Sequence, residues 1–594
     1  MKKVKIEKGI LKNIIITVFA FFVTYFLPYV INFEDELTFS NSIMSVIVFV
    51  SFIVLLKKTL IKENLLKIKN VCFLGIMFST FLVIGNSIDT NSTVEYGNIQ
   101  VYLAIIFISF VIDALIVQLY KLIEKFEKRK NKEKISKLNA NKKQLIAFLI
   151  IVVCWIPVFL AAYPGYFCYD AYDEFLQYLE ERITTWHPPI HVFILGFIIT
   201  HIANATYSFN IAIALYLFFQ MLLIAGCFTY CISFLEKYNI SKMIRIISVL
   251  YYALFPVVVM YAMCSTKDAI FSALAIVSII MAIEALLNKE EFINSKSKQI
   301  KFVMVMFLAI IFRNNAIYAY IPFLIIFAIA MKNKKILISI VSLIILYLIY
   351  IQIIYNVLQV SRTYNSEAFS VPLQQIARVY NYNYESLTKE ELDTIYEYTT
   401  DKQLKEYLPE CSDKIKDLVY LGNMGYSRFF KLWFEIGLKN PGMYIDSFLE
   451  NTLGFWYPDT IIDGYNKKAP KLYGEETSYF AAMCEPPGEE DSKIPWLRDI
   501  YYNISRYTDI NKIPVISMLF SLGAMAWGLF ICIGYNIYKK RKEIVISLSI
   551  IFFLWLTVLL GPMVLVRYVL ILFFGFPLIL AFTLNGANFT NNKE

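Results

Sequence analysis

The sequence predicts an all-α membrane protein with about fourteen transmembrane helices, outer juxtamembrane helices and a mixed loop domain outside the cytoplasm. Of its 594 residues, 58% are hydrophobic and 17% are charged, whereas soluble proteins average about 45–50% apolar and about 25% charged residues. Uncharged apolar stretches of about 20 residues recur along the chain, and each is long enough to cross about 30 Å of hydrocarbon as a helix. A water-soluble globule and a disordered chain are therefore excluded.

The charge of the loops orients the predicted spans, because short cytoplasmic loops are enriched in Lys and Arg. The first span follows several lysines and has no small-residue cleavage pattern, so we expect a retained helix with its N-terminus inside. The basic loop 121–143 then falls inside and the acidic loops fall outside. The predicted spans lie near 13–31, 40–56, 70–86, 99–120, 143–163, 208–234, 243–263, 268–287, 300–313, 315–331, 336–358, 512–537, 543–560 and 566–585.

The apolar stretch 188–205 is treated differently because of the loops that follow it. If it crossed the membrane, the basic loops 236–245 and 288–301 would be forced outside. If it does not cross, both loops fall inside, as the positive-inside rule expects. We therefore expect a juxtamembrane or re-entrant helix at the outer leaflet.

These spans divide the chain into four predicted parts. Residues 1–142 form a four-helix extension with a basic cytoplasmic loop, and 143–360 form a membrane core with a first outer loop at 164–207. Residues 361–511 form an outer loop domain, and 512–594 supply the last helices. Residues 361–511 hold 16 Lys and Arg against 24 Asp and Glu, a net charge of −8 in a chain of +9. Sorting of charge across a membrane explains this contrast better than a nucleic-acid partner.

The most informative stretch follows the fifth span. Pro164 and Gly165 end that span, and Asp170, Asp173 and Glu174 then recur at helical spacing opposite an aromatic and apolar face. The acids form either a solvated helix face or a site whose carboxylate is the general base for an acceptor hydroxyl or amine. Asp170 is the better candidate for the base, because it is the first acid after the break and lies nearest the bundle.

The three histidines of the chain are His187, His191 and His201. His187 precedes Pro188-Pro189, which keep it out of the following helix, so it shares no helical face with His191. No HExxH motif is present, and we predict no metal site. His187 is expected to hydrogen-bond substrate or orient a carboxylate, or else to be only a helix-entry residue in an ordered loop.

Three cations stand at the predicted outer ends of spans: Lys267, Arg313 and Arg567. Since the outer leaflet does not favour basic residues, each calls for a partner, either a phosphate or an acid such as the adjacent Asp268. Three such cations near an acidic helix suit a lipid-phosphate leaving group opposite a base. The candidate substrate-binding residues are Lys267, Asp268, Arg313, Asn314, Arg567 and Tyr568.

These residues also carry a resemblance. An outer-loop Asp after the first core span, a downstream His-Pro-Pro, a Lys-Asp at the outer end of a later span and a large outer loop resemble the GT-C superfamily of polytopic glycosyltransferases. The layout is similar to that of protein mannosyltransferases and lipid A aminoarabinose transferases, and the resemblance covers roughly 143–585. It implies that Asp170 is the catalytic Asp, with Asp173 or Glu174 as its neighbour, and that His187 is the HPP histidine. It also implies that Lys267, Asp268 and Arg313 surround the donor phosphate.

The predicted function is therefore inverting transfer of a sugar from a polyprenyl-phosphate carrier to a lipid, glycan or protein acceptor at the outer face of the cell membrane. The donor and membrane lipids are the expected partners, and nucleic acid is not one. A monophosphate donor needs no obligatory metal. Some relatives with diphosphate donors use one, so the resemblance leaves a divalent cation such as Mg²⁺ or Mn²⁺ possible. Two alternatives stay open: a transporter or flippase for a lipid-linked or anionic envelope substrate, and a non-catalytic envelope assembly protein.

Overall fold

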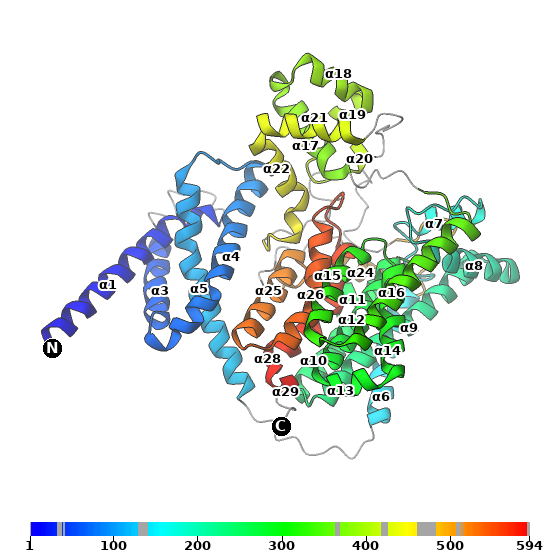
Figure 1. Ribbon diagram of the computed structural model, residues 1–594, viewed down its shortest axis with the longest axis horizontal. Coiled ribbons are helices and arrows are strands. Elements are labelled where there is room, and N and C mark those ends of the chain that lie inside the picture. Colours follow the sequence, from blue (N-terminus) through cyan, green and yellow to red (C-terminus); the bar gives the residue numbers. More distant parts are fainter. Residues whose placement is uncertain are drawn as a thin grey trace. The chain divides into compact units, whose positions relative to one another are not determined.

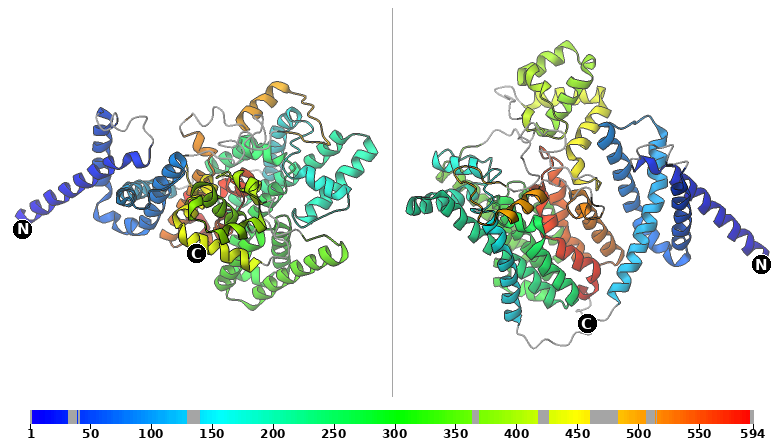
Figure 2. Two further views of the ribbon diagram at one scale, coloured as in Figure 1. Left: turned by 90° about the horizontal axis from the view of Figure 1, so that it is seen from above. Right: turned by 180° about the vertical axis from the view of Figure 1, so that it is seen from behind.

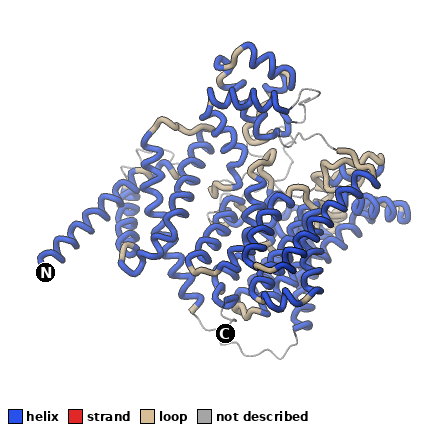
Figure 3. The backbone as a smooth tube through the Cα atoms, in the orientation of Figure 1, coloured by secondary structure: helices blue, strands red, loops and turns tan. Residues whose placement is uncertain are grey.

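The protein is helical throughout the part that the structure describes. The computed structural model describes residues 2–31, 39, 42–128, 140–362, 369–416, 426–459, 483–505, 513 and 515–590. These residues contain helices, turns and three isolated backbone bridges but no β-strand (Figure 3). The all-α prediction is confirmed. The expected mixed character of 361–511 is wrong for its described part, where capping boxes at Thr388 and Thr400 begin short helices that pack on one another.

Seven helices of the described chain are long and apolar enough to cross a membrane, which identifies a membrane protein. They are α4 (Leu65–Asn91), α5 (Ile99–Glu127), α6 (Ala140–Ala161), α8 (Pro189–Thr206), α9 (Phe209–Lys237), α12 (Lys267–Leu287) and α16 (Lys334–Gln352) with its π-helical extension η3 (Ile353–Val357). The helix α8, expected at 188–205 to be juxtamembrane or re-entrant, is also long and apolar enough to cross a membrane, although it is the least apolar of the seven.

Two further helix pairs are bent, and the number of candidate spans in the described residues rises to nine if each pair counts as one. The helix α10 (Lys242–Leu254) meets α11 (Pro256–Ala262) at 54°, and the run η9 (Val566–Val569) with α27 (Leu570–Phe574) meets α28 (Phe576–Leu584) at 41°. A proline stands in the first turn of α11 and of α28, where its missing N–H and fixed backbone angle break the preceding helix.

The predicted count of fourteen spans is not confirmed. The remaining predicted stretches fall on shorter helices or on helices with a short apolar part, namely α1 (Lys2–Tyr25), α3 (Ile43–Thr59), α14 (Lys296–Ile311), α15 (Ala316–Met331), α25 (Leu522–Tyr538) and α26 (Lys542–Val558). Apart from α1, these helices have 16 or 17 residues. Such a helix is about 24–26 Å long and falls short of a hydrocarbon layer of about 30 Å.

The chain divides into two compact units. The first contains 1–129, 366–460 and 530–540, and the second contains 130–365, 461–529 and 541–594. In the first unit, α4 and α5 run side by side in the front and rear views (Figures 1 and 2). Asp446 on α22 (Pro441–Thr452) accepts hydrogen bonds from Thr93 Oγ1 at 2.7 Å and Tyr96 Oη at 2.6 Å. The helix α22 is therefore attached to the segment between α4 and α5.

The second unit is built around α12. Beyond its first two residues this helix is almost entirely apolar, and 72% of its most apolar 18 residues are buried. Its neighbours include α9, α14, α26 and α27. A short amphipathic helix, α7 (Ala171–Leu179), packs on α8, where the ring of Tyr178 lies against Gly196. Phe175 of α7 lies in the same buried cluster as Leu195 and Leu217. These contacts fix the start of α7 within reach of the first turn of α12.

Candidate functional site

Three segments that are distant in the sequence meet at the N-terminal end of α12. Asp170 stands immediately before α7, Lys267 is the first residue of α12, and Arg567 lies in η9. Oδ2 of Asp170 accepts hydrogen bonds from Nζ of Lys267 at 2.5 Å and from Nη1 of Arg567 at 2.6 Å. One carboxylate oxygen thus binds two cations from partners 97 and 397 positions away in the chain.

The ammonium of Lys267 is surrounded by acceptors. Besides Asp170, it contacts Oε1 of Glu174 at 2.9 Å and Nδ1 of His187 at 3.0 Å. A lysine has three N–H donors, so all three are used. The adjacent Asp268, which the sequence offered as a partner, is not in this set, because neighbouring residues of a helix point in different directions.

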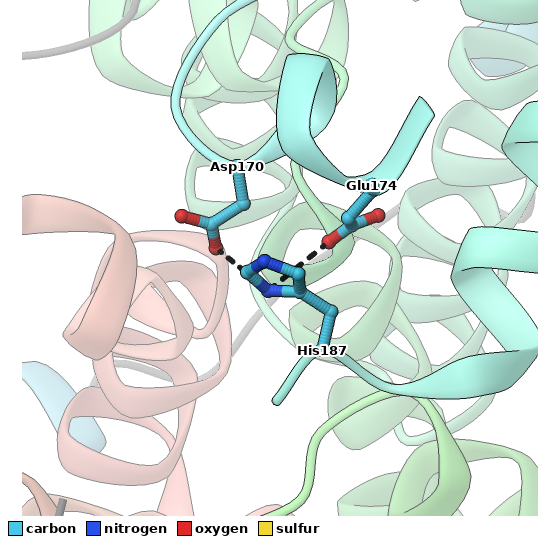
Figure 4. A group of neighbouring side chains, drawn as sticks. All are labelled: Asp170, Glu174 and His187. Carbon is cyan, nitrogen blue, oxygen red and sulfur yellow. Dashed lines mark ion pairs between the residues drawn. The ribbon is translucent and has the colours of Figure 1, made fainter. Parts of the chain in front are cut away.

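The acceptors around Lys267 have a spacing that would also suit a metal ion. The candidate ligand atoms of Asp170, Glu174 and His187 lie within 4.8 Å of one another, and the three side chains converge in Figure 4. Nζ of Lys267 lies within 3.0 Å of a ligand atom of each. The ammonium therefore supplies the positive charge between them.

The contacts of His187 define its tautomer. An ammonium can only donate, so Nδ1 of His187 accepts from Lys267 and the ring proton stands on Nε2. Nε2 then donates to Oδ2 of Asp173 at 2.8 Å. The indole of Trp186 stacks on the imidazole with ring centroids 5.4 Å apart. His187 thus links the buried Lys267 to the partly exposed Asp173.

A buried chain of polar side chains behind Glu174 was not anticipated. His191 hydrogen-bonds Oε2 of Glu174 through Nδ1 and the Tyr216 hydroxyl through Nε2, the latter at 2.9 Å. This chain connects α7, α8 and α9. The sequence carried one usable signal, because a histidine inside an apolar helix needs a polar partner.

The surroundings keep the three acids of α7 and its N-cap ionised. Burial alone would raise the pKa of Asp170, but the charges of Arg567 and Lys267 hold this pKa well below its usual range. Glu174 is also penalised by burial, yet His191 and Lys267 lower its pKa to about 2. The hydrogen bond from His187 lowers the pKa of Asp173 despite its partial burial. In this arrangement the carboxylates bind cations and are weak bases.

A second ion pair adjoins the first. Nη1 of Arg313 lies 3.3 Å from Oδ1 of Asp268, and Nη1 of Arg567 lies 4.0 Å from Oδ2 of the same carboxylate. Arg313 also donates to the carbonyl oxygen of Tyr568 at 3.0 Å. Each of the three predicted cations is therefore paired with an acid that the sequence had also singled out.

Aromatic rings hold the guanidinium of Arg567. Its central carbon lies 4.8 Å from the ring centroid of Tyr169 and 5.1 Å from that of Tyr568. Tyr568 is one of the residues that the sequence predicts to bind substrate. The Tyr169 hydroxyl lies 3.1 Å from that of Tyr261.

Asn314 lies elsewhere in the structure: its amide donates to the carbonyl oxygens of Thr185 at 2.9 Å and Trp186 at 3.3 Å. Asn314 thus supports the loop that precedes His187.

Glu485 is a further acid near the site that the sequence did not indicate. Its backbone N–H donates to the carbonyl oxygen of Phe167 at 2.6 Å, three residues before Asp170. Burial, and then the negative charge of Asp170, raise the pKa of Glu485 to about 7. No motif marks this residue within the polar stretch 361–511, and only chain folding brings it close to Asp170.

One family model matches the sequence, with the description "Family of unknown function (DUF6020)", and the match spans residues 179–593. The matched range covers more than half of the chain. It includes His187, Lys267 and Arg567 and begins after Glu174. No curated protein and no solved structure matches the sequence.

Proposed function

The chain belongs to DUF6020, a family of unknown function, and we propose that it is a glycosyltransferase that moves a sugar from a polyprenyl-phosphate carrier to an acceptor at the outer face of the membrane. The observation that carries this proposal is the shared Oδ2 of Asp170, which binds Lys267 and Arg567 in one buried cluster beside the start of an apolar helix. A candidate base and two candidate phosphate ligands thus meet at a single atom.

The cations suit a phosphate leaving group. Phosphate oxygens accept the same charge-assisted hydrogen bonds as a carboxylate, so a donor phosphate can replace Asp170 on Lys267 and Arg567. Arg313 lies near enough to Asp268 and Arg567 to contribute further positive charge. Stabilisation of the departing lipid phosphate by these groups lowers the barrier to cleavage of the sugar–phosphate bond.

The same exchange activates the base. While Lys267 and Arg567 are bound to Asp170, its low pKa makes it a poor proton acceptor. When the two cations move to the donor phosphate, their effect on the carboxyl is lost and the effect of burial, which raises the pKa, remains. Asp170 therefore becomes an effective base only when the donor is bound.

The proposed reaction is a single displacement. Asp170 takes the proton of an acceptor hydroxyl or amine, whose oxygen or nitrogen forms a bond to the anomeric carbon. The bond from that carbon to the phosphate oxygen breaks, and its electron pair leaves with the lipid phosphate, so the configuration inverts. No step of this scheme uses a divalent cation such as Mg²⁺ or Mn²⁺.

The other acids and histidines have positioning roles in this proposal. Asp173 and His187 orient Lys267 from one side, and Glu174 with His191 does so from the other. The acceptor is a lipid, a glycan or a protein.

The test measures release of free lipid phosphate when the purified protein is incubated with radiolabelled polyprenyl-phosphate sugars. The wild type should release lipid phosphate from at least one donor, and Asp170→Asn should not. Glu180→Gln is the matched control, because this exposed acid of the same segment forms its ion pair with exposed Arg182, at 2.8 Å, and not with a cation of the cluster. Thermal unfolding in detergent checks that the variants fold. A folded Asp170→Asn protein with wild-type release would refute the assignment of the base.

A transporter or flippase is the second candidate, and the bent helix run favours it. Arg567 lies in η9, at the start of the run that bends by 41° before α28. Broken helices line the substrate sites of many transporters. Vesicles that contain the protein and a fluorescent lipid-linked sugar distinguish the two functions, since a flippase moves the intact lipid across the bilayer whereas a transferase releases the lipid phosphate.

A further inference from the structure

Two buried thiols belong to the segments that lead into the ion-pair cluster. Sγ of Cys168 and Sγ of Cys264 are 3.7 Å apart, and the residues are 2% and 0% exposed. Cys168 stands two residues before Asp170, and Cys264 stands three residues before Lys267. The pair therefore connects the two segments that bring the carboxylate and the ammonium together.

The backbones on either side of the thiols are already held in register. Tyr166 and Cys264 form an isolated parallel bridge, in which the Tyr166 N–H donates to the Met263 carbonyl at 3.0 Å. The Ser265 N–H donates to the Tyr166 carbonyl at 3.0 Å, and the Cys168 N–H reaches the Ser265 hydroxyl at 3.3 Å. These bonds keep the two cysteines beside each other while their side chains rotate.

A disulfide has a sulfur–sulfur distance of about 2.05 Å, so the sulfurs must approach by roughly 1.7 Å. Rotation of the two side chains supplies a movement of this size when the backbones are already paired. We propose that Cys168 and Cys264 form a disulfide that ties the Asp170 segment to the Lys267 segment. The proposal rests on the outward-facing site of the proposed function, because the extracytoplasmic side is the oxidising one.

The chemistry is a thiol–disulfide exchange with a dithiol oxidoreductase in its disulfide form. Two S–H bonds of the chain break and one S–S bond forms, while two electrons and two protons pass to the oxidoreductase, whose disulfide becomes two thiols. Since both cysteines are buried in the folded unit, this exchange takes place before the helices close around the pair.

The covalent tie has a consequence for the site. It fixes the backbones before Asp170 and Lys267, so that only side chains move when Lys267 passes from Asp170 to a donor phosphate.

The bond should also stabilise the folded protein, because it cross-links two segments that are distant in the sequence. Its loss should lower the unfolding temperature of the protein in detergent. Dithiothreitol, which reaches the bond as the helices open on heating, should lower the unfolding temperature of the wild type and have no effect on that of Cys168→Ser, a difference that a packing role alone would not produce.

The direct test is mass spectrometry of the full chain from membranes denatured in the presence of N-ethylmaleimide and digested without reduction. We expect a linked peptide pair that contains Cys168 and Cys264 and that disappears when the denatured chain is reduced with dithiothreitol. Cys168→Ser should abolish it, and Cys154→Ser, a change in the preceding helix α6, should leave it intact. Recovery of both cysteines only as maleimide adducts would overturn the proposal. This readout needs no sugar donor, so its failure is separate from a failure of lipid-phosphate release.

Discussion

Replacement of Lys267 by methionine tests the central ion-pair cluster without any knowledge of the substrate. Methionine keeps most of the side-chain length and removes the ammonium that contacts Asp170, Glu174 and His187. Asp170 keeps its ion pair with Arg567, whereas Glu174, whose side chain is 1% exposed, loses its ion pair with Lys267. The variant therefore leaves Glu174 less well paired than Asp170. Removing one partner of a buried ion pair costs about 3–5 kcal/mol, and we expect the lower part of that range, about 3 kcal/mol.

The assay is unfolding by a denaturing detergent in mixed micelles at neutral pH. Lys237→Met is the matched control, because that ammonium also contacts a carboxylate, Glu284 at 2.6 Å, but its side chain is 57% exposed. An exposed pair of this kind contributes about 0–1 kcal/mol. The double variant Glu174→Gln with Lys267→Met should recover part of the loss, because the unpaired charge is then gone. A loss for Lys267→Met no larger than that for Lys237→Met would refute the cluster as described.

Three further predictions concern pH and packing. The pKa of Glu174 falls from 4.5 in the unfolded chain to about 2 in the folded protein, so its contribution to stability should be complete above pH 4.5 and lost as pH falls towards 2. In Glu174→Gln the free energy of unfolding should depend less on pH between 4.5 and 2. The pKa of Glu485 is raised from 4.5 to about 7, so its contribution should be complete below pH 4.5 and lost as pH rises through 7, and Glu485→Gln should remove this dependence. A Cβ on Gly196 would lie 2.1 Å from the Tyr178 ring, so Gly196→Ala should lower the free energy of unfolding by about 1–3 kcal/mol, whereas Gly226→Ala, with open space around it, should be neutral or stabilising.

Composition and local pattern were sufficient for the membrane class and for most candidate residues. Burial of apolar surface and the cost of an unpaired charge at the end of an apolar helix both depend on short stretches of chain. For this reason Asp170, Lys267 and Arg567 stood out before any contact was known. The predicted number of spans is not confirmed in the described residues, because a run of apolar residues does not show where a helix bends or how long it stays regular.

The partners were decided by the tertiary structure. Lys267 and Asp268 are adjacent in the sequence, yet Lys267 contacts Asp170 and Glu174. Asp268 pairs with Arg313 instead. Consecutive positions of a helix face different directions, so each side chain meets groups from other segments.

What the sequence alone determined is the presence of acids and cations at the ends of apolar stretches, together with the all-helical, membrane-embedded class. Only the folded chain determined that Arg567 reaches Asp170 across 397 positions and that Glu485 comes close enough for the charge of Asp170 to raise its pKa. The physical reason is that burial and helix formation are set by neighbouring residues, whereas the pairing of charges depends on how distant helices pack.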